Sequence, residues 1–592
     1  MSGPAAAAAA VAERIAAERA VPGVAVAVTD RDGVVWQHVT GYADLARRIP
    51  LRADHLLEIG SISKAATAMV VLQEVAAGRL ALDRPIGEVL PWVPAPLLDP
   101  AITVQALLTH TAGLVGSVDA LPDERAQVAG YVGGAAGSVP GARFHYSNVG
   151  FLLLGLAAGT AAGRPLPELV RERVFGPAGM RDAIPVITAA DAGRLAAGHQ
   201  PLAEDLPWRP GDPLVASPLV ETAGSDGSIA ATAADLAAFA RVLLRGGRGD
   251  AGIVLDPASF EAMTTTLAPS GEDVLVVPGR SAPEWSRYGF GINVEDSHRG
   301  RVFSHGGGMV GYASFLLADP AAGRAVVVLT NADGDSPIAA AIARSVDAGL
   351  DGGGAPAGDR GLSGSRWARP VASLAASDHL SVRPPALPTE AQGVFVGADG
   401  GRLEVRAVGD GYEVGLDGSA APLHWTWSDR CVTSLPALRR FALVFDGTGW
   451  SWGPEEFLPE RAAGGSPSRA PGLDPSDPSL ATAPGHYRSY TPWYPHLRIV
   501  RRGSRLVLIA PRGVEAPADD QSLVPLGDGA FRVGADPAAP ESLRLGPVVD
   551  GGCVWIERDG CRYSRSFMPC VDPSTGAAER HDPRVRTGEQ QP

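Results

Sequence analysis

The chain has 592 residues, of which 45% are hydrophobic and 20% are charged, and its formal net charge at pH 7 is −14. This length exceeds one ordinary domain and predicts about two to four domains. An acidic surface repels phosphate backbones, so we expect no nucleic-acid partner.

The N-terminal stretch and the hydropathy pattern indicate where in the cell the protein is expected to be. The alanine-rich start is interrupted by Glu13 and Arg14, which indicates an amphipathic helix rather than a signal peptide. The apolar runs are shorter than the ~18 residues of a membrane span. We therefore expect a cytoplasmic protein with no membrane partner, and the sequence leaves the oligomeric state open.

Strand and helix patterns mix over the first 352 residues. We expect a hairpin at residues 24–40 that turns at Asp32 and Gly33, and a helix at residues 61–80. Strand patterns return at residues 288–294, 301–305, 312–319 and 324–331, and a helix begins at Pro337. Strands at both ends with helices between them predict an α+β domain, residues 1–352, with helices packed on one antiparallel sheet.

The rest of the chain has a strand-like composition with two breaks. Residues 353–385 are rich in Gly, Ala, Pro and Ser and are interpreted as a linker, and residues 459–481 as a second linker. Residues 386–458 and 482–571 share a weak repeat, in which Leu403 or Leu497 lies six residues before a glycine. We expect two small antiparallel β domains, each a meander or barrel, and a disordered tail at residues 572–592.

Four cysteines lie in the last third of the chain, and their spacing matches no zinc pattern. We interpret them as free core thiols in a reducing compartment and expect no metal and no other cofactor. They are Cys431, Cys553, Cys561 and Cys570.

The stretch E-I-G-S-I-S-K-A-A-T, residues 58–67, contains Lys64, the one lysine in a chain with 51 Lys and Arg residues. Ser61 and Lys64 are three residues apart at the start of a predicted helix, so they share one face. A serine hydroxyl needs a base to become a nucleophile. A buried, neutral lysine can be that base, whereas arginine stays protonated. Free N–H groups at a helix start can also hold an oxyanion.

Two further stretches carry polar groups suited to the same chemistry. In F-H-Y-S-N-V-G-F, residues 144–151, the Tyr146 phenol can relay a proton and the Asn148 amide can hold a substrate carbonyl. In F-S-H-G-G-G-M, residues 303–309, glycines allow close approach to the backbone, and His305 is a titratable donor. His110 in T-H-T-A-G is interpreted as a packing residue near this site.

The motifs S-I-S-K, Y-S-N and H-G-G occur in the order, and at about the spacing, of the three motifs of penicillin-recognising serine hydrolases, which the chain resembles. The segments L-L-T-H-T-A-G-L (107–114) and G-S-D-G-S-I-A-A-T-A-A-D-L-A-A-F (224–239) are similar to that family's connecting segments. The resemblance covers residues ~10–350 and is nearest to the class C β-lactamase, D-aminopeptidase and family VIII esterase branch. It implies a β-lactamase/DD-peptidase-like fold for the first domain. We expect the two β domains that follow to be barrel- or lipocalin-like.

The resemblance also implies a role for each motif residue. The nucleophile is Ser61, and Lys64 and Tyr146 share the role of base. The substrate would be bound by Asn148, His305, Gly306 and Gly307. The oxyanion hole would be formed by the backbone N–H groups of Ser61 and Gly308.

Two features depart from β-lactamases and cell-wall carboxypeptidases. Gly306 stands where those enzymes carry a Thr or Ser that helps bind the substrate carboxylate. The expected lack of an export signal also differs, since their substrates lie outside the membrane. D-aminopeptidases have a similar layout of a catalytic domain followed by two β-barrels, so we expect a D-aminopeptidase, D-stereospecific amidase or esterase acting on a small molecule or short peptide.

Several alternatives stay open from the sequence alone. A penicillin-binding-protein-type thioesterase that cyclises peptides, a β-lactamase and a D,D-carboxypeptidase would use the same residues. A sensor module that binds acyl groups without turnover is the alternative of another class. An α/β-hydrolase is disfavoured because no G-x-S-x-G follows the His-Gly-Gly-Gly run. The aromatic stretch at residues 488–496 belongs either to a β-domain core or to a loop that enters the active site.

Overall fold

The structure, a computed structural model, describes residues 4–565 except for 118–122, 132–139, 204, 210, 278–279, 333, 335, 352–386, 399, 410, 428–429, 461–471 and 511–518. The first predicted linker, the predicted tail and part of the second predicted linker lie outside these residues, and so does Cys570. The predicted domain boundaries stay predictions. The predicted fold class is confirmed, with an α+β domain built on one antiparallel sheet, followed by two closed antiparallel barrels.

An eight-stranded antiparallel sheet forms the centre of the first domain, in the order β3-β2-β1-β12-β11-β10-β9-β8. The first strands and the last strands of the domain meet in the middle, because β1 pairs with both β2 and β12. The strands are β1 (Gly23–Asp30), β2 (Val34–Asp44), β3 (Ile49–Pro50), β8 (Ser286–Tyr288), β9 (Asn293–Ser297), β10 (Gly300–Met309), β11 (Tyr312–Asp319) and β12 (Arg324–Thr330).

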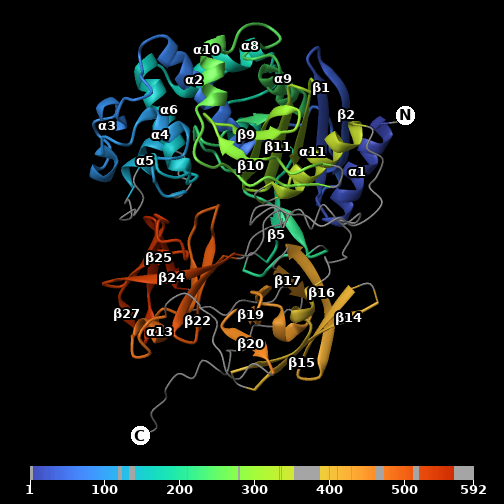
Figure 1. The fold of residues 1–592 in the computed structure, drawn as a ribbon, viewed down its shortest axis with the longest axis vertical. Coiled ribbons are helices and arrows are strands. Elements are labelled where there is room, and N and C mark those ends of the chain that lie inside the picture. Colours follow the sequence, from blue (N-terminus) through green and yellow to red (C-terminus); the bar gives the residue numbers. More distant parts are fainter. Residues whose placement is uncertain are drawn as a thin grey trace.

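Alternation along β1 explains why helices cover both faces of this sheet. Val24, Val26 and Val28 pack in one apolar cluster with residues of α1 and α11, whereas Ala25 and Ala27 belong to the cluster on the other face. On that second face α9 packs against β1, β11 and β12, and α2 and α6, which pack against each other, extend the same apolar cluster (Figure 1). The helices of the domain are α1 (Pro4–Glu18), α2 (Ser63–Ala76), α3 (Ile86–Val89), α4 (Val104–Leu108), α5 (Glu124–Ala129), α6 (Asn148–Ala162), α7 (Leu166–Val170), α8 (Gly176–Ala178), α9 (Ala233–Leu244), α10 (Pro257–Thr265) and α11 (Pro337–Leu350).

Short elements complete the domain. The two-stranded sheets pair β4 (Leu57–Glu58) with β7 (Ala230–Ala231), and β5 (His199–Pro201) with β6 (Leu214–Ala216). The 3-10 and π-helical turns are η1 (Gly60–Ile62), η2 (Ala95–Leu98), η3 (Arg171–Phe175) and η4 (Ala189–Asp191).

One predicted strand is wrong and another is longer than expected. Residues 288–294 do not form one strand: β8 ends at Tyr288, β9 begins at Asn293, and Gly291 between them has φ +70°. The strand predicted at residues 301–305 is longer than expected, because β10 continues through the His-Gly-Gly-Gly run, ends at Met309 and pairs with β11. Ladder pairing with β11 therefore outweighs the low strand propensity of three glycines.

The remaining strands form two closed antiparallel barrels of eight strands each. The weak sequence repeat marks equivalent hairpin turns, since Gly409 lies between β14 and β15 and Gly503 between β22 and β23, both at positive φ. The strands of the first barrel are β13 (Gly393–Gly397), β14 (Arg402–Val408), β15 (Gly411–Leu416), β16 (Ser419–Trp427), β17 (Arg430–Thr433), β18 (Leu443–Phe445), β19 (Trp450–Trp452) and β20 (Glu455–Pro459).

The second barrel lies beneath the helical side of the first domain and beside the first barrel (Figure 1). Cys431, Cys553 and Cys561 are buried and take part in no disulfide, as expected. The strands of the second barrel are β21 (Gly485–Arg488), β22 (His496–Arg502), β23 (Arg505–Ala510), β24 (Asp519–Gly527), β25 (Ala530–Val533), β26 (Ser542–Leu545), β29 (Trp555–Arg558) and β30 (Cys561–Arg565). The remaining elements here are the hairpin β27 (Val548–Val549) and β28 (Gly552–Cys553), helix α13 (Ser479–Thr482), and the turns η5 (Thr389–Ala391) and η6 (Pro436–Leu438).

Candidate active site

Ser61 lies in the 3-10 turn η1, which runs directly into α2. The preceding residue, Gly60, has φ +50°, and a Cβ there would lie 2.7 Å from the backbone N of Gly308 in β10. A side chain at position 60 would therefore collide with the β10 backbone. This close approach places the Gly308 backbone beside Gly60, which directly precedes Ser61. The oxyanion hole predicted for the N–H groups of Ser61 and Gly308 stays a prediction.

Lys64 is completely buried in the first turn of α2. Its Nζ lies 3.0 Å from Ser61 Oγ and 2.8 Å from the carbonyl oxygen of Asp226, to which it donates. The rings of Tyr146 and Phe151 lie near the same nitrogen, with centroids at 5.0 Å and 5.7 Å. The lysine therefore meets the serine hydroxyl in surroundings that hold little water.

Burial lowers the pKa of Lys64 to about 8, although the negative fields of Asp226 and Glu272 act in the opposite direction. At neutral pH a substantial minority of the molecules then carry a neutral amine that can accept the Ser61 proton. Burial also raises the pKa of Glu272 to about 7 and raises that of Asp226. Neither acid was singled out from the sequence, where single carboxyl residues carry no pattern.

Tyr146 and Asn148 lie where the chain enters α6. Ser147 caps this helix: its Oγ accepts from Gly150 N at 3.1 Å and donates to Val115 O at 2.7 Å. His110 also holds this loop through two hydrogen bonds: its Nδ1 accepts from Ser147 N and its carbonyl oxygen accepts from His145 N. Burial lowers the pKa of His110 well below its usual value, so it stays neutral, in keeping with the packing role expected for it.

The third predicted motif lies in β10 beside η1. A Cβ on Gly307 would overlap the carbonyl oxygen of Ile59, and one on Gly306 would overlap Ser336 Oγ. Ser336, just before α11, thus places a hydroxyl where a Thr or Ser at position 306 would begin its side chain. The sequence carried no signal for Ser336, which lies 30 residues further along the chain.

His305 is fully buried rather than open to the solvent. Its Nε2 lies 2.7 Å from the hydroxyl of Tyr288, and its Nδ1 lies 2.6 Å from the carbonyl oxygen of Gly306. The Tyr288 hydroxyl then donates to Nε2, and Nδ1 donates to Gly306 O. Burial lowers the pKa of His305 to about 3, so its ring is neutral at physiological pH. Its predicted part in substrate binding stays a prediction.

The structure therefore brings the three sequence motifs to one place. Lys64 contacts Ser61 and faces the Tyr146 ring, and the Tyr146 and His305 rings lie 6.3 Å apart. Among the described residues, no group of three His, Cys, Asp or Glu side chains could hold a metal ion. Within the same residues no single helix is long and apolar enough to cross a membrane, while the bent pair Asn148–Ala162 and Leu166–Ala178 passes that test by length and composition.

The chain belongs to the β-lactamase family: the family model described as Beta-lactamase matches residues 8–350. A penicillin-binding protein 4 from Amycolatopsis lactamdurans is 29% identical over 323 residues, which cover 53% of this chain and 82% of that protein. A D-aminopeptidase from Cereibacter sphaeroides is 32% identical over 179 residues, 27% of this chain and 33% of that enzyme. The octameric penicillin-binding protein homologue from Pyrococcus abyssi shares the fold, with 21% identity, a TM-score of 0.50, and coverage of 77% of this chain and 99% of that one. The protein is thus a serine acyl-hydrolase of the β-lactamase and penicillin-binding-protein family.

The lowered pKa of Lys64 predicts the pH dependence of the reaction. If neutral Lys64 is the base, kcat/KM for a short-chain p-nitrophenyl ester rises with pH and levels off above about pH 8. A pH–rate profile from about pH 6 to pH 10 measures this, with Ser61→Ala as the blank for spontaneous hydrolysis. A profile that stays flat through pH 8 would contradict the role of Lys64 as base.

Proposed function

We propose that Ser61 forms an acyl-enzyme with a small amide or ester, and that the protein is a D-aminopeptidase, D-stereospecific amidase or related esterase. The observation that carries the proposal is the 3.0 Å approach of a buried, readily deprotonated Lys64 to the Ser61 hydroxyl. The likeness to a D-aminopeptidase supports the amide class.

The proposed chemistry follows from what each group can give or accept. Neutral Lys64 takes the Ser61 proton as Oγ attacks the substrate carbonyl. The N–H groups of Ser61 and Gly308 stabilise the negative charge that develops on the carbonyl oxygen. The Tyr146 phenol relays the proton to the leaving group, and Asn148 holds the substrate amide. Water then attacks the acyl carbonyl while neutral Lys64 takes a proton from it. The bond between the acyl carbon and Ser61 Oγ breaks, and Lys64 passes that proton to Oγ.

The charges around Lys64 favour a substrate with a free amine over one with a free carboxylate. Asp226 and Glu272 act on Lys64 through their negative charge when they are ionised, and they would then attract a substrate ammonium group. Because burial raises the pKa of both acids, this attraction is strongest above about pH 7. His305 is neutral, so it offers a substrate carboxylate no positive charge. A carboxylate-specific enzyme of this family would gain more from a lysine at that position.

Substitution of the two motif residues tests the nucleophile and the base. We expect Ser61→Ala and Lys64→Arg each to lower kcat/KM by at least about a thousandfold, because the first removes the attacking atom and the second puts a permanently charged group beside it. Ser63→Ala is a matched control in the same motif, since its Oγ accepts from Ile229 N. Mass spectrometry after fluorophosphonate treatment should find one adduct, on the peptide containing Ser61. An adduct elsewhere, or near-normal turnover in Lys64→Arg, would end the proposal.

The substrate class is tested by competition among three reporters. We expect kcat/KM for D-alanine p-nitroanilide or a short-chain p-nitrophenyl ester to exceed that for nitrocefin, whose carboxylate meets no cation from His305. The three constants should be measured on one enzyme preparation, with L-alanine p-nitroanilide as the stereochemical control. Fastest turnover of nitrocefin by a wide margin would make the protein a β-lactamase instead.

A further inference from the structure

The loop between β25 and β26 of the second barrel, residues 534–541, reaches the catalytic domain. The loop has a defined shape, since Val533 N donates to Glu541 O at 2.9 Å and Ala538 N donates to Asp536 Oδ1 at 2.9 Å. Two of its acidic side chains bond to the segment that leads into the Tyr146 loop. A different loop of this barrel, residues 488–496, was the one considered from the sequence, and Tyr490 in that loop is fully exposed.

Glu541 makes the better shielded of these two contacts. One carboxylate oxygen, Oε1, accepts from Gly116 N at 3.0 Å and lies 2.7 Å from His145 Nε2. The side chains of Glu541 and His145 are 16% and 22% exposed. Burial raises the pKa of Glu541, but the bonds from His145 and Gly116 together bring it below its usual value, so the group is an anion at neutral pH.

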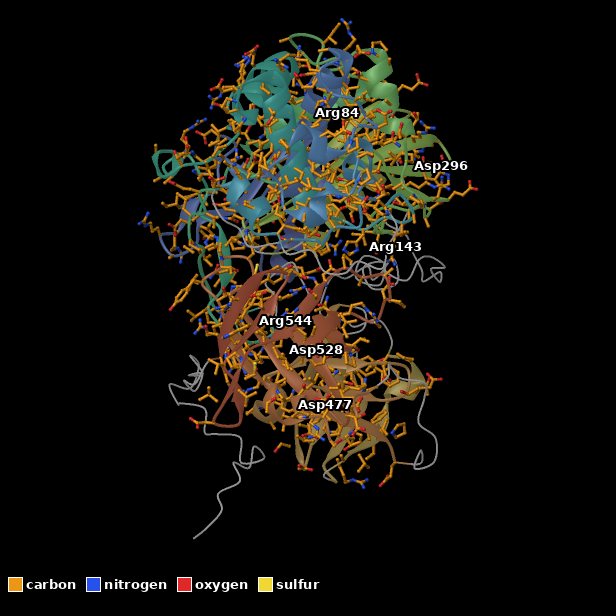
Figure 2. All side chains as sticks on the ribbon, turned by 90° about the vertical axis from the view of Figure 1, so that its left-hand side faces the viewer. Arg84, Arg143, Asp296, Asp477, Asp528 and Arg544 are labelled. Atoms are coloured by element: carbon orange, nitrogen blue, oxygen red, sulfur yellow. The ribbon has the colours of Figure 1, made fainter. Side chains whose placement is uncertain are left out.

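Asp536 makes the second contact, an ion pair with Arg143 in which Arg143 Nη1 lies 3.0 Å from Asp536 Oδ1. Both side chains are more exposed, at 47% and 38% respectively, and Figure 2 labels Arg143 at the edge of the catalytic domain next to the second barrel. Exposed pairs of this kind contribute little. We therefore expect the shielded hydrogen bonds of Glu541 to contribute more than the Asp536 ion pair to the contact between the second barrel and the catalytic domain.

Both partners of Glu541 hold the loop that carries the predicted catalytic groups. Gly116 O accepts from Asn148 N at 2.7 Å, and His145 directly precedes Tyr146. A single carboxylate oxygen from the second barrel thus joins the segment at Gly116 to the segment at His145. Loss of this acceptor would free one N–H of each segment and let the Tyr146 phenol shift relative to Lys64.

We propose that Glu541 is a positioning residue: the second barrel holds the Tyr146–Asn148 loop in its reactive geometry through this side chain. The inference rests on the proposed role of Ser61 and Tyr146. It goes beyond that role, because it makes the catalytic domain depend on a residue 425 positions away from Gly116 in the chain. A displacement of about 1 Å in such a loop can reduce a rate by about a hundredfold.

The test uses full-length variants and a short-chain p-nitrophenyl ester. Glu541→Ala should lower kcat at least about tenfold with KM changed less than about threefold, because proton transfer rather than binding is affected. Glu541→Gln should retain activity within about threefold of wild type, since its amide oxygen can still accept from Gly116 N and His145 Nε2. Asp536→Ala and Glu557→Ala are the controls, the second being a carboxylate of the same barrel that faces Arg562. Both should stay within about twofold of wild type.

A cycle with His145→Ala separates positioning from general loss of structure. If the two residues act through one contact, the double variant Glu541→Ala/His145→Ala loses about as much kcat as either single variant. Equal kcat in Glu541→Ala and Glu557→Ala, or a Glu541→Gln as slow as Glu541→Ala, would overturn the inference. Should Glu541→Ala fail to fold, Glu541→Gln and His145→Ala carry the test, and wild-type kcat in His145→Ala overturns it.

Fluorophosphonate labelling distinguishes a failure of the proposed function from a failure of the positioning role of Glu541. A wild-type protein that is not labelled on Ser61 would contradict the proposed function itself. A labelled wild type together with Glu541→Ala labelled at the same rate would leave the proposed function standing and overturn only the positioning role.

Discussion

The burial of one amine against one hydroxyl is the constraint on which the rest of the site depends. Holding the pKa of Lys64 at about 8 rather than 10.5 corresponds to roughly 3 kcal/mol of disfavoured charge, which the fold must carry. Arginine could not serve as the base at this position, because its guanidinium does not lose its proton in a protein. A chain that otherwise uses arginine throughout keeps lysine at this one position.

The burial of Lys64 requires backbone segments to come unusually close to α2. A Cβ on Gly291, in the turn between β8 and β9, would lie 2.7 Å from the carbonyl oxygen of Lys64. A Cβ on Gly60 would likewise lie too close to the backbone of Gly308, and a Cβ on Gly307 would overlap the carbonyl oxygen of Ile59. These glycines allow the β8–β9 turn to lie against the backbone of α2, and β10 to lie against the backbone before Ser61. The conformational freedom that glycine loses on folding is the cost of packing the fully buried Lys64 beside Ser61.

The sequence pattern was sufficient to predict those elements whose formation depends on residues close together in the chain. The β1–β2 hairpin, the α2 start and the β-rich C-terminal third follow from period, turn residues and helix signals in the sequence. The differences fall where distant contacts decide. Residues 289–292 leave the strand where Gly291 packs against the backbone of α2, and β10 extends through H-G-G-G because β11 pairs with it. Of the site, the motif residues were accessible from spacing. Ser336, Asp226 and Glu541 were not, since each is defined only by what the fold places opposite it.

The barrels are joined to each other as well as to the catalytic domain, and this bears on how a contact at Glu541 can be held. Arg505 pairs with Glu456 across the two barrels, and Phe441 of the first barrel packs in one apolar cluster with Val500 and Val507 of the second. Arg498 of the second barrel reaches Asp205 of the catalytic domain at 2.8 Å. The loop at Glu541 is thus fixed by a barrel that is itself anchored at other points. A carboxylate presented on a rigid, separately anchored barrel can define the position of an active-site loop, whereas the same residue on a free surface loop would follow that loop as it moves.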